Sequence, residues 1–331
     1  MAHAHDVAAI GNAIVDVIAP CDDAFLDAQG LAKGTMTLID DARAAELYAA
    51  MAAGVEASGG SAGNTVAGIA SLGGSAAYIG KVADDQLGEV FSHDLRAQGV
   101  HFATSPMAGG PETARCLINV TPDGQRTMAT FLGVAGQLGP DDVDPALIEG
   151  AAVTYLEGYL FDPPPAREAF HKAAKIARKA GRRVSITLSD VFVVERWRED
   201  LLDFLSAATD VLFANENELL ALCQTDDFED AVDRVRTLVP LAAVTRSEKG
   251  SLVLAGGQAH EIEAFPVEKV IDTTGAGDQY AAGFLYGLAR GRPLPECGRL
   301  GALAAAEVIS HYGPRPMVSL AELAAKEGLG G

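Results

Sequence analysis

Short apolar runs alternate with helical segments from about residue 150 onward, and this alternation limits the possible folds more than any other feature of the chain. Apolar runs of strand length lie at Val153–Leu156, Val184–Leu188, Val211–Ala214 and Ala242–Val244, with helical patterns between them over 166–180, 195–208 and 216–223. Uniformly apolar strands that alternate with helices are typical of a parallel sheet with helices on both faces. We therefore predict an α/β fold around a mostly parallel central sheet.

The N-terminal third adds elements of the same kind. One opening strand is expected over Val7–Ile10 and Ala13–Ile18, interrupted at Gly11-Asn12. The other expected elements are a helix near Ala42–Ala53, a glycine-rich turn over Gly59–Asn64 that leads into a helix to Leu72, a strand over Tyr78–Val82, and a helix capped by Asp84 or Asp85 that ends near Gln98.

Two segments, 13–40 and 103–135, do not follow the alternation. Within the second, Arg115–Val120 and Arg126–Leu132 flank the turn sequence Thr-Pro-Asp-Gly-Gln, which predicts a β-hairpin. We expect these two segments to form a small β-sheet that acts as a lid. The large domain would then comprise 1–12, 41–102 and 136–331.

Charge and cysteine content exclude several classes of partner. The chain of 331 residues has 45 acidic and 25 basic side chains, a formal net charge of −20, which repels nucleic acid and anionic membranes. Its four cysteines form no CxxC pair, so we expect reduced thiols and no zinc site. No secretory pattern or apolar run of membrane length is visible, and we expect a cytoplasmic location.

The segment Asp272–Asp278, Asp-Thr-Thr-Gly-Ala-Gly-Asp, carries the strongest chemical signal. The amphipathic pattern that follows it predicts a helix whose first turn is Gly275–Asp278. Amides at a helix start attract anions, and glycine lets a phosphoryl group approach closely. A carboxylate at this place is suited to accept a proton from an attacking hydroxyl, which indicates phosphoryl transfer to an alcohol. Alternatively, Asp278 only favours the helix N-terminus and the glycines only form a turn.

Other phosphate-binding motifs are absent from the sequence. The one Gly-Lys pair, Gly80-Lys81, precedes Val82, so no GxxxxGK[ST] loop is present. Protein-kinase HRD and DFG motifs are also missing. The first strand is not followed by GxGxxG, which argues against a nicotinamide oxidoreductase.

Four motifs follow one another along the chain at Gly59–Asn64, Gly80–Gly88, Asn215–Glu218 and Asp272–Asp278. In these motifs and their order, the chain resembles the ribokinase-like (PfkB) carbohydrate and nucleoside kinases over nearly its whole length. One departure is Ala83, where the family often has glycine. The resemblance implies a three-layer α/β fold with a small β-sheet lid.

Within the family, the chain is most similar to adenosine kinases. Asn12 and Asp16 are separated by four positions, as in that group, and Ala24–Asp27, Thr37–Asp41 and Tyr155–Tyr159 also look alike. This implies ATP-dependent phosphorylation of the adenosine 5′-hydroxyl to AMP in purine salvage, with Mg²⁺ and K⁺, by a monomer or a dimer. The alternatives are a kinase for inosine, guanosine or a free sugar such as ribose or fructose, or a non-catalytic ligand-binding or regulatory protein.

The resemblance assigns roles on the acceptor side. Asp278 is expected to be the general base, and the amides of Gly275, Ala276 and Gly277 an anion hole. Asp16 and Asn64 would hold the ribose hydroxyls, with Gly60 allowing close approach. Asn12 would contact the base or ribose, or serve only as a turn residue. Candidates for the purine pocket are Leu132, Val134 and Leu160, although such side chains are also typical of plain core.

Further roles concern ATP and its cations. Asn215 and Glu218 would organise Mg²⁺ through water, although their spacing fits a capping box equally well. Arg126 would close over the transferred phosphate or lie exposed on its strand. Thr245 and Gly250 resemble the ATP-side loop, and Asp272 and Thr274 resemble part of a monovalent-cation site.

Overall fold

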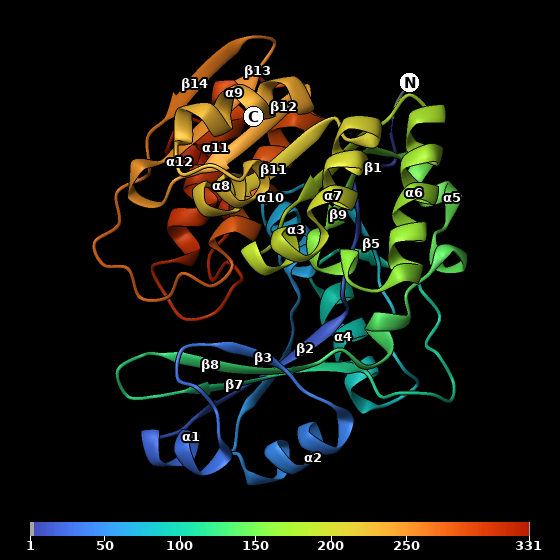
Figure 1. The fold of residues 1–331 in the computed structure, drawn as a ribbon, viewed down its shortest axis with the longest axis vertical. Coiled ribbons are helices and arrows are strands. Elements are labelled where there is room, and N and C mark those ends of the chain that lie inside the picture. Colours follow the sequence, from blue (N-terminus) through green and yellow to red (C-terminus); the bar gives the residue numbers. More distant parts are fainter. Residues whose placement is uncertain (1–2, 331) are drawn as a thin grey trace.

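A computed structural model describes residues 3–330 and shows a large α/β part with a smaller β-sheet beneath it (Figure 1). The strands are β1 His5–Ile10, β2 Ile14–Pro20, β3 Met36–Leu38, β4 Val55–Ser58, β5 Ala76–Ile79, β6 His101–Phe102, β7 Ala114–Val120, β8 Arg126–Phe131, β9 Ala151–Glu157, β10 Arg183–Thr187, β11 Val211–Asn215, β12 Leu241–Thr245, β13 Ser251–Ala255 and β14 Gln258–Ile262. The α-helices are α1 Asp23–Gln29, α2 Asp41–Ala50, α3 Ser61–Ser71, α4 Gln86–Ala97, α5 Pro145–Gly150, α6 Pro164–Lys179, α7 Val191–Ala208, α8 Glu216–Cys223, α9 Phe228–Leu238, α10 Ala276–Ala289, α11 Leu294–Val308 and α12 Leu320–Lys326. Short 3₁₀ helices lie at Gly133–Gln137, Pro140–Asp142, Gly158–Phe161 and Ser247–Lys249.

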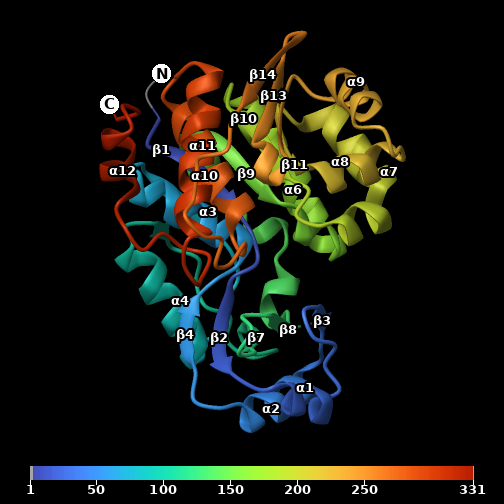
Figure 2. The same ribbon diagram turned by 90° about the vertical axis from the view of Figure 1, so that its left-hand side faces the viewer.

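The large part is built on a nine-stranded sheet in the order β14-β13-β12-β11-β10-β9-β1-β5-β6. The strands from β12 to β6 in that order run parallel, and β13 and β14 run antiparallel. Alternate residues of β1 enter opposite cores, because Ala8 and Ile10 pack with α5–α9 whereas Val7 and Ala9 pack with α3, α4, α10 and α11. Helices therefore cover both faces of the sheet, as the alternation predicted (Figure 2).

The smaller part is a five-stranded sheet in the order β3-β8-β7-β2-β4, which we call the lid sheet. The opening strand of the sequence prediction is thus two strands, since β1 lies in the large sheet and β2 in the lid sheet. The chain passes between them at Gly11, where an added Cβ would lie only 2.5 Å from both Ala62 Cβ and Glu157 Oε2. Only glycine fits at this crossing point.

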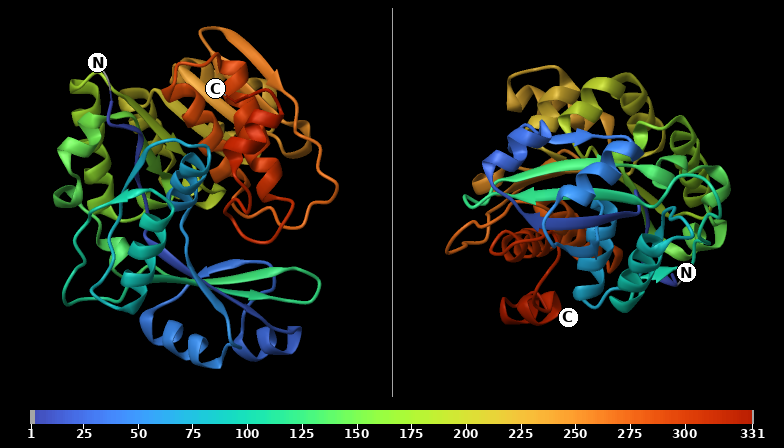
Figure 3. Two further views of the ribbon diagram at one scale, coloured as in Figure 1. Left: turned by 180° about the vertical axis from the view of Figure 1, so that it is seen from behind. Right: turned by 90° about the horizontal axis from the view of Figure 1, so that it is seen from below.

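Residues 41–58 belong with the lid sheet, whereas the sequence-based boundary put them in the large domain. β4 pairs antiparallel with β2, with Val15 opposite Ser58. The helix α2 lies against the lid sheet (Figure 3). Its Leu47 is fully buried against Val17 and Leu117 of that sheet. The sequence Val-Glu-Ala-Ser of β4 is too short to show an alternating pattern, which explains why the strand was not predicted.

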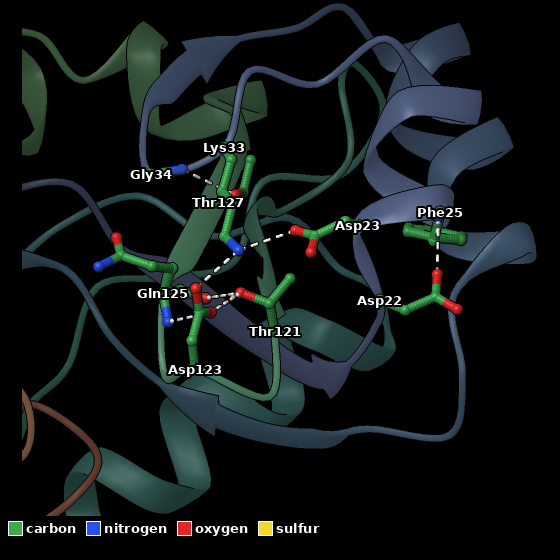
Figure 4. A network of polar contacts seen from close by, with 9 residues as sticks. All are labelled: Asp22, Asp23, Phe25, Lys33, Gly34, Thr121, Asp123, Gln125 and Thr127. Carbon is green, nitrogen blue, oxygen red and sulfur yellow. Dashed lines mark hydrogen bonds and ion pairs between the residues drawn. The ribbon is translucent and has the colours of Figure 1, made fainter.

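A polar network fixes the outer end of the lid sheet (Figure 4). Lys33 Nζ lies 2.8 Å from Asp23 Oδ1 and 2.7 Å from Asp123 Oδ2, so it joins α1 to the β7–β8 turn. The Thr121 hydroxyl donates to Asp123 Oδ1 at 2.6 Å. These bonds hold the turn of the predicted hairpin. Among the described residues, no helix combines the length and the apolar character that a membrane span requires.

Candidate active site

The predicted phosphate-binding segment does begin a helix. α10 starts after Gly275, whose backbone has φ of 78° and ψ of 0°. An added Cβ there would lie 2.6 Å from Pro314 Cβ, so both conformation and space require glycine. Gly277, two residues further along, is exposed, and a Cβ added there would meet no atom of residues 3–330 within 4 Å. The space beside Gly277 is therefore open, whereas the Ala276 amide already donates to Thr273 O at 3.2 Å. An anion hole formed by these amides stays a prediction.

Asp278 lies in the first turn of α10 and faces the start of α3. Its Oδ1 accepts a hydrogen bond of 2.6 Å from Ser61 Oγ, and its Oδ2 accepts one of 3.0 Å from Asn64 Nδ2. Burial raises the pKa of Asp278, while these two hydrogen bonds and the charge of Arg315 lower it. The half-buried carboxylate is thus oriented on both oxygens, which suits a general base.

Asp16, Gly60 and Asn64 meet at the same place. Gly60 precedes α3 with φ of 81°, and an added Cβ would lie 2.4 Å from Asn12 O. Gly59 lies so close to the Asp16 side chain that a Cβ would be 2.4 Å from its carboxylate. The pKa of Asp16 is raised to about 6, mainly by burial and also by the charge of Asp278, against the lowering charges of Arg315 and Arg126. The predicted base and ribose-binding residues therefore lie close together in the structure.

Asn12 holds the chain at the crossing point between the two sheets. Its Nδ2 donates to Glu157 Oε1 at 2.7 Å and its backbone N–H to the same oxygen at 3.3 Å. Glu157 Oε2 accepts a bond of 2.9 Å from the Ala62 amide. Burial raises the pKa of Glu157 to about 7. Both Asn12 donors serve this contact, so its structural role is the one that the geometry shows.

The predicted ATP-side residues lie at the carboxyl edge of the large sheet. Asn215 ends β11 and Thr245 ends β12, and the two are register partners. Ligands of open α/β sheets bind at this edge. Gly250 has φ of 81°, and a Cβ there would lie 2.0 Å from Ile262 O, which gives the glycine a structural reason of its own.

Asn215 and Glu218 form a capping box at the start of α8. Asn215 Oδ1 accepts from the Glu218 amide at 2.8 Å, and Glu218 Oε2 accepts from the Asn215 amide at 3.0 Å. Burial raises the pKa of Glu218 to about 7. Within residues 3–330, no group of three or more His, Cys, Asp or Glu side chains is placed to hold a metal ion. Asn215 Nδ2 also donates to Glu218 Oε1 at 2.7 Å, so both Glu218 oxygens serve the capping box. The structure shows the capping role, and a role around Mg²⁺ through water stays a prediction.

Asn215→Ala should lower the free energy of unfolding by about 1 kcal/mol and raise the KM for MgATP, because both the cap and the water contacts are lost. Asn215→Ser is the matched variant, since serine also caps helices well. It should restore most of the stability but not the Mg²⁺ dependence of kcat. Urea unfolding and Mg²⁺ titrations of turnover measure the two effects. A normal Mg²⁺ dependence in the serine variant would leave Asn215 with the capping role alone.

Arg126 and Asp272, predicted for different ligands, form an ion pair with each other. Asp272 also accepts from Thr274 Oγ1 at 2.7 Å and from the Gly313 amide at 3.0 Å. A monovalent cation at Asp272 would therefore have to displace Arg126. Arg126 is 9% exposed, and its Nε and one Nη have no hydrogen-bond partner within residues 3–330. Two unpartnered donors on a buried arginine fit a phosphate group.

The candidates for a purine pocket differ in exposure. Leu160 is fully buried in the core cluster beneath α6 and α7, so we do not propose it as a ligand contact. Val134 is fully buried as well, whereas Leu132 is half-buried. Apolar residues near a lid strand do not differ in sequence from core residues, and the structure places Leu160 among the latter.

Nearly the whole chain matches one family of kinases. The model of pfkB family carbohydrate kinases matches residues 4–320. The chain belongs to this family. Such kinases transfer phosphate to small molecules, and this chain is a phosphotransferase for a nucleoside or a sugar.

Two solved structures are similar to this kinase over nearly its whole length. An adenosine kinase from Sinorhizobium meliloti is 55% identical with a TM-score of 0.92, covering 98% of this chain and 99% of that chain. A probable sugar kinase from Rhizobium etli CFN 42 is 52% identical with a TM-score of 0.93, covering 99% of both chains. A cytidine kinase from Thermococcus kodakarensis is 34% identical over 197 residues, which are 58% of this chain and 66% of that protein.

Three polar residues of the pocket of this kinase were given no role from the sequence. Ser61 and Glu157 lie inside quoted motifs, and their polar character beside Gly60 and Gly158 was the available signal. Arg315 follows Gly313-Pro314 in a segment without helical or strand periodicity, so nothing in the pattern indicated that it is buried beside Asp278.

Proposed function

We propose that this kinase transfers the γ-phosphoryl group of ATP to the 5′-hydroxyl of a purine nucleoside, with adenosine as the preferred acceptor. The observation that supports it most is the Asp278 carboxylate, held by Ser61 and Asn64 at the start of α10. The likeness to the Sinorhizobium meliloti adenosine kinase and the spacing of Asn12 and Asp16 favour adenosine over the other acceptors.

In the proposed reaction, Asp278 accepts the proton of the 5′-hydroxyl as its oxygen attacks the γ-phosphorus. Asp16 and Asn64 hold the ribose so that this oxygen lies within hydrogen-bonding reach of Asp278. The amides of Gly275–Gly277 stabilise the charge on the transferred group. Arg126 adds a positive charge from the lid sheet. Mg²⁺, when bound beside Asn215 and Glu218, neutralises the charge of the ATP phosphates.

An assay of ADP formation with adenosine, inosine, guanosine, cytidine, ribose and fructose tests the acceptor. Adenosine should give the highest kcat/KM, and the product should carry its phosphate on the 5′-oxygen by ³¹P NMR. A higher kcat/KM with cytidine or with a free sugar would move this kinase to another substrate class. The absence of turnover with all six acceptors would favour a ligand-binding role.

The backbone amides of the lid sheet should exchange their hydrogens with solvent more slowly when adenosine binds. It meets the large domain through few elements, and relative motion is the default for such an interface. Exclusion of water would also limit hydrolysis of ATP. We expect slower hydrogen exchange in 13–40 and 115–132, with the strands after residue 150 little changed. Equal protection in both regions, or none in the lid sheet, would contradict closure.

A further inference from the structure

Arg315, in the segment between α11 and α12, connects three elements around the pocket. Its Nε donates to Asn64 Oδ1 at 3.2 Å. One Nη donates to Ser58 Oγ and lies 3.3 Å from Asp94 Oδ2. Ser58 ends β4 of the lid sheet, Asn64 lies on α3 and Asp94 on α4. A single guanidinium therefore fixes the end of a lid strand against both helices.

The bond to Asn64 determines which way its amide faces. Because Arg315 can only donate, Asn64 must present its oxygen to Arg315, and this places Nδ2 against Asp278. Without the arginine, only the bond to Asp278 itself would hold the Asn64 amide in this orientation, and its oxygen would lose its partner. Partners of this kind orient a reactive side chain that they do not touch.

The arginine is also the positive charge nearest to a cluster of acidic groups. The titratable or charged groups around Asp278, Asp16 and Arg315 are Tyr78, Asp94, Cys116, Arg126, Tyr155, Glu157, Tyr159 and Glu218. Arg315 lowers the pKa of both Asp16 and Asp278, whereas burial raises both. Its second Nη is buried without a hydrogen-bond partner among residues 3–330, which makes this position costly for the folded state.

We propose that Arg315 is a positioning residue for phosphoryl transfer, which orients Asn64 toward Asp278 and provides the positive charge that allows Asp16 and Asp278 to lie near each other. The inference deepens the proposed function and rests on Asp278 as its base. It does not depend on which nucleoside or sugar is the acceptor.

The test compares Arg315→Gln and Arg315→Lys with the wild-type enzyme. Arg315→Gln should lower kcat at pH 7 roughly ten- to hundredfold, and the acidic limb of the pH–kcat profile should move up by about one pH unit. Arg315→Lys keeps the positive charge but loses the planar set of guanidinium N–H donors. The acidic limb of its pH–kcat profile should therefore stay at the wild-type pH, while kcat still falls. Arg290→Gln is the control, since Arg290 pairs with the buried Asp6 at 2.8 Å outside the pocket, and its profile should match the wild type.

A second readout needs no turnover. The ¹³C signal of the Asp278 carboxyl group, assigned with Asp278→Asn, should titrate about one pH unit higher in Arg315→Gln than in the wild type. An unmoved titration in a folded variant would overturn the proposal, whatever the acceptor assay shows. If Arg315→Gln does not fold, the test rests on Arg315→Lys. A wild-type kcat in Arg315→Lys would then overturn the proposed positioning role.

Discussion

Asp278→Asn is expected to reduce kcat by two to four orders of magnitude while nucleoside affinity changes by a few-fold at most, because general-base catalysis contributes roughly 10²–10⁴-fold. Asparagine keeps the shape of the side chain. Its oxygen can still accept from Asn64, and the Ser61 hydroxyl can turn to accept from the new amide. The pocket should therefore survive while the proton acceptor is lost.

Single-turnover kinetics and calorimetric titration with adenosine separate these two effects. Ser61→Ala is the matched control, because it removes one hydrogen bond to Asp278 and leaves the base in place. Its kcat should fall far less than that of Asp278→Asn. Near-normal turnover in Asp278→Asn would show that another group takes the proton. A large loss of adenosine affinity would show instead that the carboxylate binds the substrate in its ground state.

Asp16 is expected to lower the stability of the folded protein at neutral pH, although it is proposed to bind the ribose. Its pKa of about 6 in the folded protein lies above the value of about 3.9 in an unfolded chain. The folded state therefore binds more protons, and the contribution of Asp16 to stability falls as the pH rises from about 4 to about 6. Asp16→Asn should raise the free energy of unfolding at pH 7.5 by about 2 kcal/mol. The gain should shrink towards zero near pH 4, as urea unfolding at both pH values would show.

The same residue should set the preference for ribose over deoxyribose. A 2′- or 3′-deoxynucleoside leaves a buried polar group unpaired, which costs about 1–3 kcal/mol and so roughly tenfold or more in affinity. Asp16→Ala should remove that penalty and bring kcat/KM for adenosine and its deoxy forms close together. If the wild-type ratio persists in Asp16→Ala, the sugar hydroxyls are bound elsewhere.

The parts of the fold with a repeating pattern were predictable from the sequence. The parallel strands after residue 150 and the start of α10 followed from apolar periodicity and from the glycines before Asp278. β4 and the lid position of α2 did not, because which sheet a four-residue strand joins depends on distant partners in the chain.

The pocket was predictable to a similar extent. Asp16, Asn64 and Asp278, each proposed from a motif, lie together in the structure. The place of Arg315 in the site was not predicted, because an arginine in an irregular segment has the same sequence pattern whether it is exposed or buried. The ion pair between Arg126 and Asp272 was not predicted either, because it joins the lid sheet to a loop of the large domain that is far away in sequence.

The position of β1 has a consequence for the order in which the protein can fold. β1 is the first strand of the chain, yet it lies inside the large sheet between β5 and β9. During synthesis it meets β5 after residue 76, but its other edge stays open until Ala151–Glu157 has left the ribosome. Contacts over such sequence separations form slowly and leave apolar edges exposed meanwhile. Glu157, the last residue of β9, then bonds Asn12 and joins the first half of the chain to the second, so we expect the β1 edge to be closed only at that stage of synthesis.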